Sequence, residues 1–219
     1  MIKSLLPAGL VSLALMCSSA SAQVELSDRV ATLYEQQLDE LFVWFHQHPE
    51  LSMMEHQTAG RLAAELEALG YEVDTGIAET GIVAILRNGD GPMVMMRADM
   101  DGLPVQEKTG LPYASTAVQT DWQGNDVPTM HACGHDVHVT SLVGTARIMV
   151  EQRAHWSGTL MLIGQPAEER IMGARAMRDA GIWDTYGRPD YALALHVASS
   201  VPTGMIVADP APYSGADTV

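Results

Sequence analysis

One short segment in the middle of the chain combines the side chains that bind transition metals in proteins. Residues 131–138 contain His131, Cys133, His135, Asp136 and His138. Thiolate, imidazole and carboxylate groups are the ligands that suit zinc and its divalent neighbours. Cys133 and His135 can face one ion if the segment is extended, because the glycine between them lets the backbone bend. The spacing therefore predicts a metal site in this segment.

Further side chains of the same chemical types follow three apolar runs, each of which we expect to be a β-strand. They are Asp99 and Asp101, Glu168 and Glu169, and His196. Open α/β sheets place their functional sites at the carboxyl ends of strands. We therefore expect these side chains to lie close to one another and to the metal-binding segment.

Each of these features has a structural explanation when it is taken alone. A histidine at a strand end such as His196 is often structural, and two adjacent acids can begin a helix, where they complement its dipole. A lone cysteine is usually a small buried hydrophobe. The coincidence of all the groups favours a metal site. A thiol hydrolase built on Cys133 is disfavoured, because its cysteine and histidine are normally distant in sequence.

The composition is that of a globular protein. Of 219 residues, 47% are hydrophobic and 18% are charged, which is too apolar for a disordered chain. The formal net charge of −15 argues against nucleic-acid binding, which needs a basic surface. Two cysteines cannot build a scaffold of several disulfides.

The first 22 residues have the pattern of a secretory signal peptide. Lys3 precedes an apolar run over residues 5–16, and small residues follow up to a cleavage site after Ala22. The run is too short to span a membrane, which takes about 20 apolar residues. We therefore expect an exported protein, periplasmic or secreted. A lipoprotein modified at Cys17 is disfavoured, because Met16 is bulkier than the small residue usual at that position.

Hydrophobic periodicity predicts an α/β fold with a largely parallel or mixed sheet covered by helices on both faces. We expect a first helix that begins at residue 27 and ends before Pro49. Three further helices are expected over residues 59–69, 139–150 and 173–180. The expected strands cover residues 81–86, 93–96, 159–163 and 192–195, the last of them buried. The sequence NGDG at residues 88–91 predicts a hairpin that pairs the first two strands.

At these residues the chain resembles the M20 metallopeptidase superfamily, and in particular the amidohydrolase branch of hippurate, N-acyl-amino-acid and auxin-conjugate hydrolases. The matching motifs are HPELS at residues 48–52, RADMDGLP at 97–104, MHACGHD at 130–136, QPAEE at 165–169 and LHV at 195–197. The motifs follow one another in the same order as in the family. The cysteine-containing motif favours the amidohydrolase branch, because the peptidases and carboxypeptidases of the superfamily, the alternative, usually carry an aspartate at the bridging position.

The resemblance implies a dinuclear metallohydrolase that cleaves amide bonds of small molecules such as N-acyl amino acids. Its metal ligands would be Cys133, His135, Glu169 and His196. Glu168 would be the general base, and Asp101 would orient a ligand, with Asp99 as its rival for a place in the site. The two divalent ions could be zinc, manganese, cobalt or nickel, since all accept mixed sulfur, nitrogen and oxygen ligands.

The resemblance also predicts the domain organisation. Residues 23–212 would be the N-terminal part of the catalytic domain, and residues 213–219 the start of a lid and dimerisation domain. Relatives continue for about as many residues again, with a further histidine ligand in that half, and full-length relatives are expected to be homodimers. An inactive metal-binding remnant is therefore the second alternative to an active hydrolase.

Overall fold

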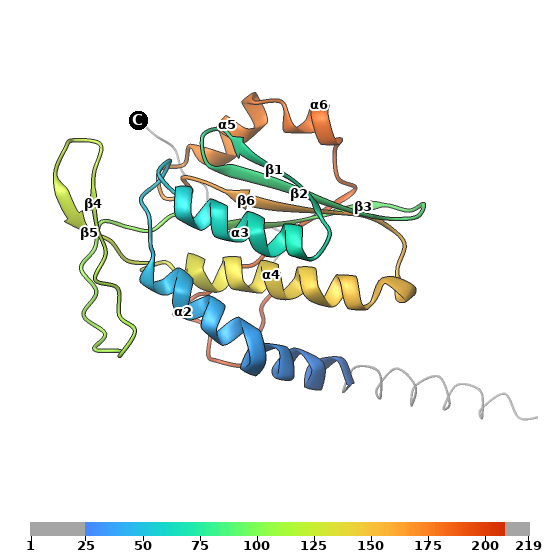
Figure 1. Ribbon diagram of the computed structural model, residues 1–219, viewed down its shortest axis with the longest axis horizontal. Coiled ribbons are helices and arrows are strands. Elements are labelled where there is room, and N and C mark those ends of the chain that lie inside the picture. The colour runs from blue at the N-terminus through green and yellow to red at the C-terminus, as the bar shows by residue number, and fades with distance from the viewer. Residues whose placement is uncertain (1–24, 209–219) are drawn as a thin grey trace, which may run out of the picture.

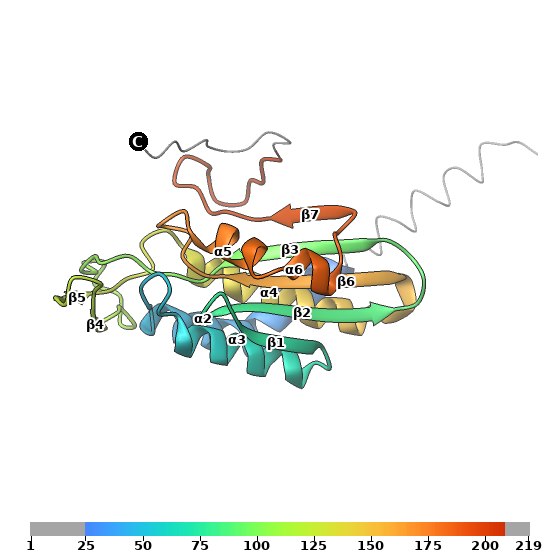
Figure 2. The same ribbon diagram turned by 90° about the horizontal axis from the view of Figure 1, so that it is seen from above.

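The computed structural model describes residues 25–208, which form a five-stranded mixed sheet with helices on both faces (Figures 1 and 2). The strand order is β1-β2-β6-β3-β7. The strands are β1 (Glu72–Ile77), β2 (Gly81–Asn88), β3 (Met93–Asp99), β6 (Gly158–Gln165) and β7 (Tyr191–Ala194). The expectation of an α/β fold with a mixed sheet is confirmed. The predicted signal peptide and residues 213–219 lie outside the described residues.

Two helical layers cover the sheet. The helices of the first layer are α2 (Asp39–Gln47), α3 (His56–Ala68) and α4 (His135–Glu151), and those of the second are α5 (Gly173–Asp179) and α6 (Ile182–Tyr186). Helical residues 25–33 and a π-helical turn, Tyr34–Leu38, precede α2. In Figure 2 the first layer lies behind the sheet, and α5 and α6 lie in front of it. None of the described helices is long and apolar enough to cross a membrane.

Alternating side chains of the central strands build two cores. Ile82, Ala84 and Leu162 point into the core under α2, α3 and α4. Val83 and Ile163 belong to the core under α5 and α6. Because both faces are covered, these strands carry nearly continuous apolar runs, which is the pattern that identifies them in the sequence.

The predicted pairing of the first two strands is wrong, because β6 lies between them. It pairs antiparallel with β2 and parallel with β3. The NGDG turn does reverse the chain, with Gly89 and Gly91 at φ values of 77° and 157°. A turn signal specifies reversal but not which strands become neighbours. β6 is the central strand of the five-stranded sheet, and every residue in it but one is buried.

The prediction of a buried last strand is also wrong. β7 is an edge strand whose paired neighbour among the described residues is β3. All four of its residues are exposed, although they are Tyr191, Ala192, Leu193 and Ala194. The opposite edge strand, β1, was not predicted, because its sequence EVDTGI contains no apolar run. A small separate sheet pairs β4 (Val118–Thr120) with β5 (Asp126–Pro128).

The different environments of β6 and β7 predict different costs for the same substitution. Leu162→Ala removes a fully buried side chain from the centre of the sheet, and we expect it to lower the free energy of unfolding by about 2–5 kcal/mol. Leu193→Ala on β7, where the side chain is 59% exposed, should change it by less than about 0.5 kcal/mol. Urea denaturation of both variants measures the difference, and equal losses would contradict this description of the core.

Candidate metal centre

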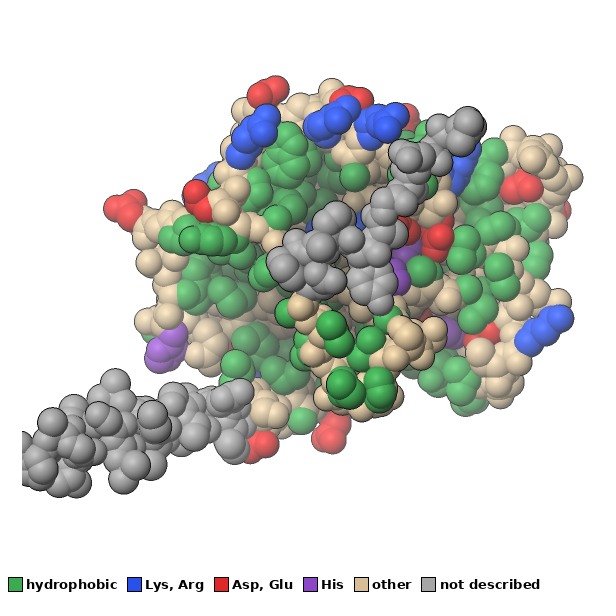
Figure 3. Space-filling view, turned by 180° about the vertical axis from the view of Figure 1, so that it is seen from behind, with side chains coloured by type: hydrophobic (Ala, Val, Ile, Leu, Met, Phe, Trp, Pro, Cys, Tyr) green, Lys and Arg blue, Asp and Glu red, His purple; other side chains and the backbone are tan. Residues whose placement is uncertain are grey.

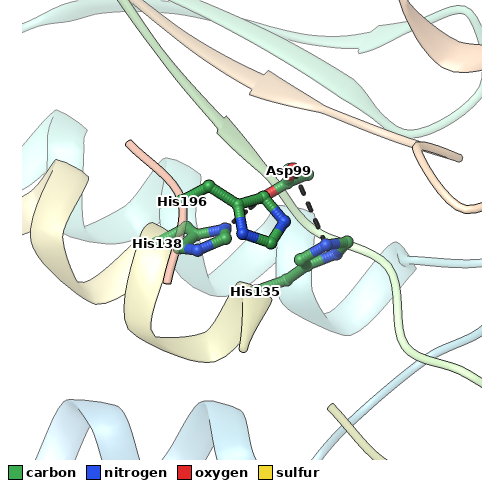
Figure 4. A group of neighbouring side chains, drawn as sticks. All are labelled: Asp99, His135, His138 and His196. Atoms are coloured by element: carbon green, nitrogen blue, oxygen red, sulfur yellow. Dashed lines mark hydrogen bonds and ion pairs between the residues drawn. The ribbon is translucent and has the colours of Figure 1, made fainter. Parts of the chain in front are cut away.

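Two groups of potential metal ligands meet at one end of the sheet. In each group the ligand atoms all lie within 4.8 Å of one another. One group is Cys133, His135 and Glu169, and the other is Asp99, His135, His138 and His196. His135 belongs to both groups. Five of the seven site residues that the sequence predicts fall in these groups, and the other two, Glu168 and Asp101, lie outside them. Figure 4 shows the three histidine rings and the Asp99 carboxylate of the second group pointing toward one another.

The local fold at the start of α4 presents His135 to this site. Gly134 precedes the helix with a φ of 81°, and a side chain there would approach Val197 Cγ2 to 2.3 Å. The His135 ring is fully buried, and its Nδ1 donates a hydrogen bond to the backbone oxygen of Asp101 at 2.7 Å. That bond leaves the lone pair of Nε2 facing the acids of the site.

Five buried side-chain atoms in the described chain lack the hydrogen-bond partners that buried polar atoms normally have, and two of them belong to predicted metal ligands. These two are His135 Nε2 and Glu169 Oε1, which lie 3.9 Å apart. The Cys133 thiol completes a set of sulfur, nitrogen and oxygen donors around them. A divalent cation would satisfy these atoms, so the donor set fits the metal that the sequence predicts.

Asp101 joins the histidine to the loop that carries the two glutamates. Its carboxylate accepts hydrogen bonds from Ser52 Oγ at 2.6 Å, from Glu168 N at 3.0 Å and from Glu169 N at 3.1 Å. Burial by itself would raise the pKa of Asp101, but the His135 ring, whose Nδ1 lies 3.4 Å from Oδ1, and the hydrogen bond from Ser52 outweigh it and lower the pKa. Asp101 is thus a charged group that holds site residues in place.

Asp99 supports the site from the other side. Its carboxylate accepts a hydrogen bond from Arg97 at 2.6 Å and another from His138 Nδ1 at 2.6 Å. Burial opposes ionisation of Asp99, yet the His138 hydrogen bond and the Arg97 charge hold its pKa below the usual range. His138 Nε2 accepts a hydrogen bond from Val197 N at 2.9 Å, so both ring nitrogens of His138 are engaged. This chain of contacts fixes the segment that carries His196.

His138 and His131 are site residues to which the sequence assigned no role. The engaged nitrogens of His138 make it a supporting residue, which its place in the sequence could not reveal. His131 is 4% exposed, and neither of its ring nitrogens has a partner in the described chain. Burial lowers its pKa to about 4, so the ring is neutral at pH 7. It lines the same cleft as Cys133, Glu168 and His196.

The cleft is open to solvent. The Glu168 side chain is 36% exposed, and its Oε2 lies 3.8 Å from His135 Nε2. His196 is exposed, and its Nε2 lies 3.5 Å from Cys133 Sγ. Figure 3 shows histidine and acidic side chains side by side on this face of the molecule.

Without a metal the site is electrostatically unfavourable. Burial and the neighbouring Glu169 charge raise the pKa of Cys133 to about 12. Burial also raises the pKa of Glu169. Both shifts reflect negative charge that lacks a counter-ion, and a bound divalent cation would reverse them by stabilising the thiolate and the carboxylate.

Asp136, the acid that follows His135 in the metal-binding segment, contacts a histidine outside the candidate site. It accepts a hydrogen bond from His46 Nδ1 at 2.7 Å, and His46 Nε2 lies 3.1 Å from Glu107 Oε1. This buried contact joins α2, the first turn of α4 and the loop that carries Glu107. It therefore ties the first turn of α4 to α2.

The mixed sheet and the clustered thiol, imidazole and carboxylate groups define an α/β metal-binding protein. A family model, Peptidase family M20/M25/M40, matches residues 95–211, and the chain belongs to this family. It is 37% identical over 172 residues to IAA-amino acid hydrolase ILR1-like 2 of Arabidopsis thaliana, covering 75% of this chain. It is 39% identical to N-acetylcysteine deacetylase of Bacillus subtilis over 74% of the chain, and 41% identical to hippurate hydrolase of Campylobacter jejuni over 69%.

A solved structure shows the same fold. The YXEP protein of Bacillus subtilis, described as a dinuclear metal binding peptidase from the M20 family, matches with a TM-score of 0.68 and 36% identity over 78% of this chain. The match covers 45% of that structure. The chain likewise spans 36%, 40% and 37% of the length of the three curated relatives.

The His46 contacts predict a pH-dependent stability. Burial of the ring lowers the pKa of His46, but the hydrogen bonds to Asp136 and Glu107 outweigh it and raise the pKa. The protonated ring therefore stabilises the fold fully below the unfolded-state pKa of about 6.5, and this contribution is lost as the pH rises through the higher folded-state pKa. We expect His46→Gln to cost about 1.5–3 kcal/mol at pH 6 and clearly less at pH 9.

Urea denaturation at both pH values measures this difference. His48→Gln is the matched control, because the ring of His48 bonds the backbone oxygen of Trp44 and, among the described residues, no carboxylate. A cost of His46→Gln that is the same at pH 6 and pH 9 would contradict the assignment of a charged His46.

Proposed function

We propose that this chain forms the metal centre of an amidohydrolase that cleaves the amide bond of N-acyl amino acids or similar small molecules. The single observation that carries the proposal is the pair of unsatisfied buried atoms, His135 Nε2 and Glu169 Oε1, beside the Cys133 thiol and the half-exposed Glu168 carboxylate. The names of the similar proteins, which include a hippurate hydrolase and an N-acetylcysteine deacetylase, support this substrate class.

Four side chains would hold two divalent ions at this site: Cys133, His135, Glu169 and His196. When bound, such ions polarise a carbonyl group and increase the acidity of water. Zinc, manganese, cobalt and nickel all suit mixed sulfur, nitrogen and oxygen donors, and the choice among them depends on geometry and availability.

Glu168 is the residue we assign as general base. Its carboxylate is half-exposed in the cleft, so it can accept the proton of an attacking water on Oε2 and return it to the nitrogen atom of the leaving amine. Asp101 fixes the backbone of Glu168 through the hydrogen bond to its amide, and it fixes the His135 ring through its own backbone oxygen. Asp99 acts indirectly: it binds His138, which in turn binds the backbone next to His196.

Peptide hydrolysis is the alternative activity. The chain is also 40% identical over 164 residues to thermostable carboxypeptidase 1 of Saccharolobus solfataricus. The same residues would perform either reaction, because both cleave an amide bond. The two activities differ in which substrates the protein accepts, so a substrate panel separates them.

The experiment compares wild-type protein and Glu168→Gln on N-acyl amino acids and on dipeptides, after loading with each candidate metal. We expect hydrolysis of N-acyl amino acids by the wild type, and a loss of at least about 100-fold in the variant with unchanged metal content. Full turnover by the variant would exclude Glu168 as general base. Faster cleavage of dipeptides would favour the peptidase, and bound metal without turnover of any substrate would identify an inactive remnant.

We also propose that the protein is exported after removal of residues 1–22. The support is the sequence pattern of Lys3, the apolar run over residues 5–16 and the small residues that end at Ala22. Mass spectrometry of the protein from the periplasm or medium of an expressing bacterium should find Gln23 as its first residue. A product in the cytoplasm that retains the first 22 residues would refute export.

A further inference from the structure

The two glutamates of the site lie in a backbone segment that cannot hold its shape unaided. Ala167 and Ile171, on either side of them, have φ values of 48° and 54°. This left-handed conformation is unfavourable for residues with a side chain and persists only where the surroundings impose it. The segment that carries Glu168 and Glu169 therefore depends on contacts from the rest of the molecule.

Part of this support comes from within the loop. The backbone oxygen of Ala167 accepts hydrogen bonds from Met172 N at 3.1 Å and from Gly173 N at 3.2 Å. A side chain at Gly173 would come within 1.5 Å of the Pro166 oxygen, so only glycine allows the loop to close in this way. These bonds hold the carbonyl group of Ala167, but its amide N–H needs a partner from outside the loop.

That partner is Glu55, which no motif assigned to the metal centre. Its side chain is fully buried, and its Oε1 accepts hydrogen bonds from Ala167 N at 2.8 Å and from Met53 N at 2.9 Å. Its Oε2 accepts a hydrogen bond from Thr80 Oγ1. Met53 also has a left-handed backbone, with a φ of 64°. One carboxylate thus holds two strained backbone segments at once.

We propose that Glu55 is a positioning residue for Glu168 and Glu169. It binds the amide of Ala167, and Asp101 binds the next two amides along the chain, so two buried carboxylates fix three consecutive amides. This arrangement aims Glu169 Oε1 at His135 Nε2. The inference deepens the proposed function and rests on its assignment of the two glutamates.

A second buried carboxylate, that of Glu50, provides a control that distinguishes a positioning role at the site from general support of the fold. Glu50 lies five residues before Glu55 and is 5% exposed. Its side chain accepts hydrogen bonds from Gln57 N at 3.0 Å and from Thr58 N at 2.8 Å, in the first turn of α3. It makes no side-chain hydrogen bond to the loop of Ala167 within the described residues. Glu50 is therefore a matched control.

The test measures Co²⁺ binding by the 219-residue chain from the absorption of the thiolate–cobalt bond, and amide hydrogen exchange of residues 167–169 without metal. We expect Glu55→Met to raise the Kd for Co²⁺ by about 10-fold or more and to speed exchange at Ala167. Glu55→Gln should stay within about threefold of the wild type, because its amide oxygen can still accept the Ala167 and Met53 bonds. Glu50→Met should change neither quantity, although it lowers stability.

Equal effects of Glu55→Met and Glu50→Met, or wild-type behaviour of Glu55→Met, would overturn the proposal. If Glu55→Met fails to fold, the pair Thr80→Val and Thr58→Val decides, because each removes one hydroxyl bond, to Glu55 and to Glu50 respectively. We then expect faster exchange at Ala167 in Thr80→Val alone, and equal exchange in the two variants would overturn the proposal. The exchange measurement needs neither turnover nor metal, so it stands even where the proposed hydrolysis fails.

Discussion

The arrangement of the candidate metal centre depends on the buried carboxylate of Asp101, just after the end of β3. It bonds the amides of Glu168 and Glu169 while the backbone oxygen of the same residue holds the His135 ring. One residue therefore joins the strand that ends at the site, the loop after β6 and the first turn of α4. Ser52 donates a further hydrogen bond from the segment before α3. Without the Asp101 carboxylate, the loop that carries the two glutamates would lose its hydrogen bonds to the residue that also binds the His135 ring.

The sheet explains why these segments meet. β3 pairs in parallel with both β6 and β7, with Asp99 opposite Gln165 in the first pair. The carboxyl ends of the three strands therefore lie at the same edge of the sheet, and the segments that follow these strands lie close together there. α4 begins at the same edge, because left-handed Gly134 turns the chain into the helix directly after Cys133. Sequence separations of more than 60 residues, as between His135 and His196, thus become ligand distances.

This meeting of segments was predictable from the sequence because strand ends and metal-ligand types are local signals. Strand neighbours were not, since the turn at residues 88–91 says nothing about β6, which begins at Gly158. The exposure of β7 was missed because its residues are as apolar as those of a buried strand. His138 and Glu55 were missed for a different reason. Their roles arise from hydrogen bonds to Asp99 and Ala167, partners that only the folded chain brings together.

The acids of the site differ in how many of their hydrogen bonds the protein itself supplies, and this difference supports the roles that we propose for them. Asp99, Asp101 and Glu55 are buried, and each accepts several bonds from fixed donors. A carboxylate buried and held in this way is out of reach of a reactant in the cleft, which favours a positioning role for it. Glu168 accepts no side-chain hydrogen bond within residues 25–208, and its oxygens face the open cleft. Among these acids, Glu168 is the one whose side chain is open to the cleft, which supports its proposed role as general base, and the buried carboxylates hold the backbone that carries it.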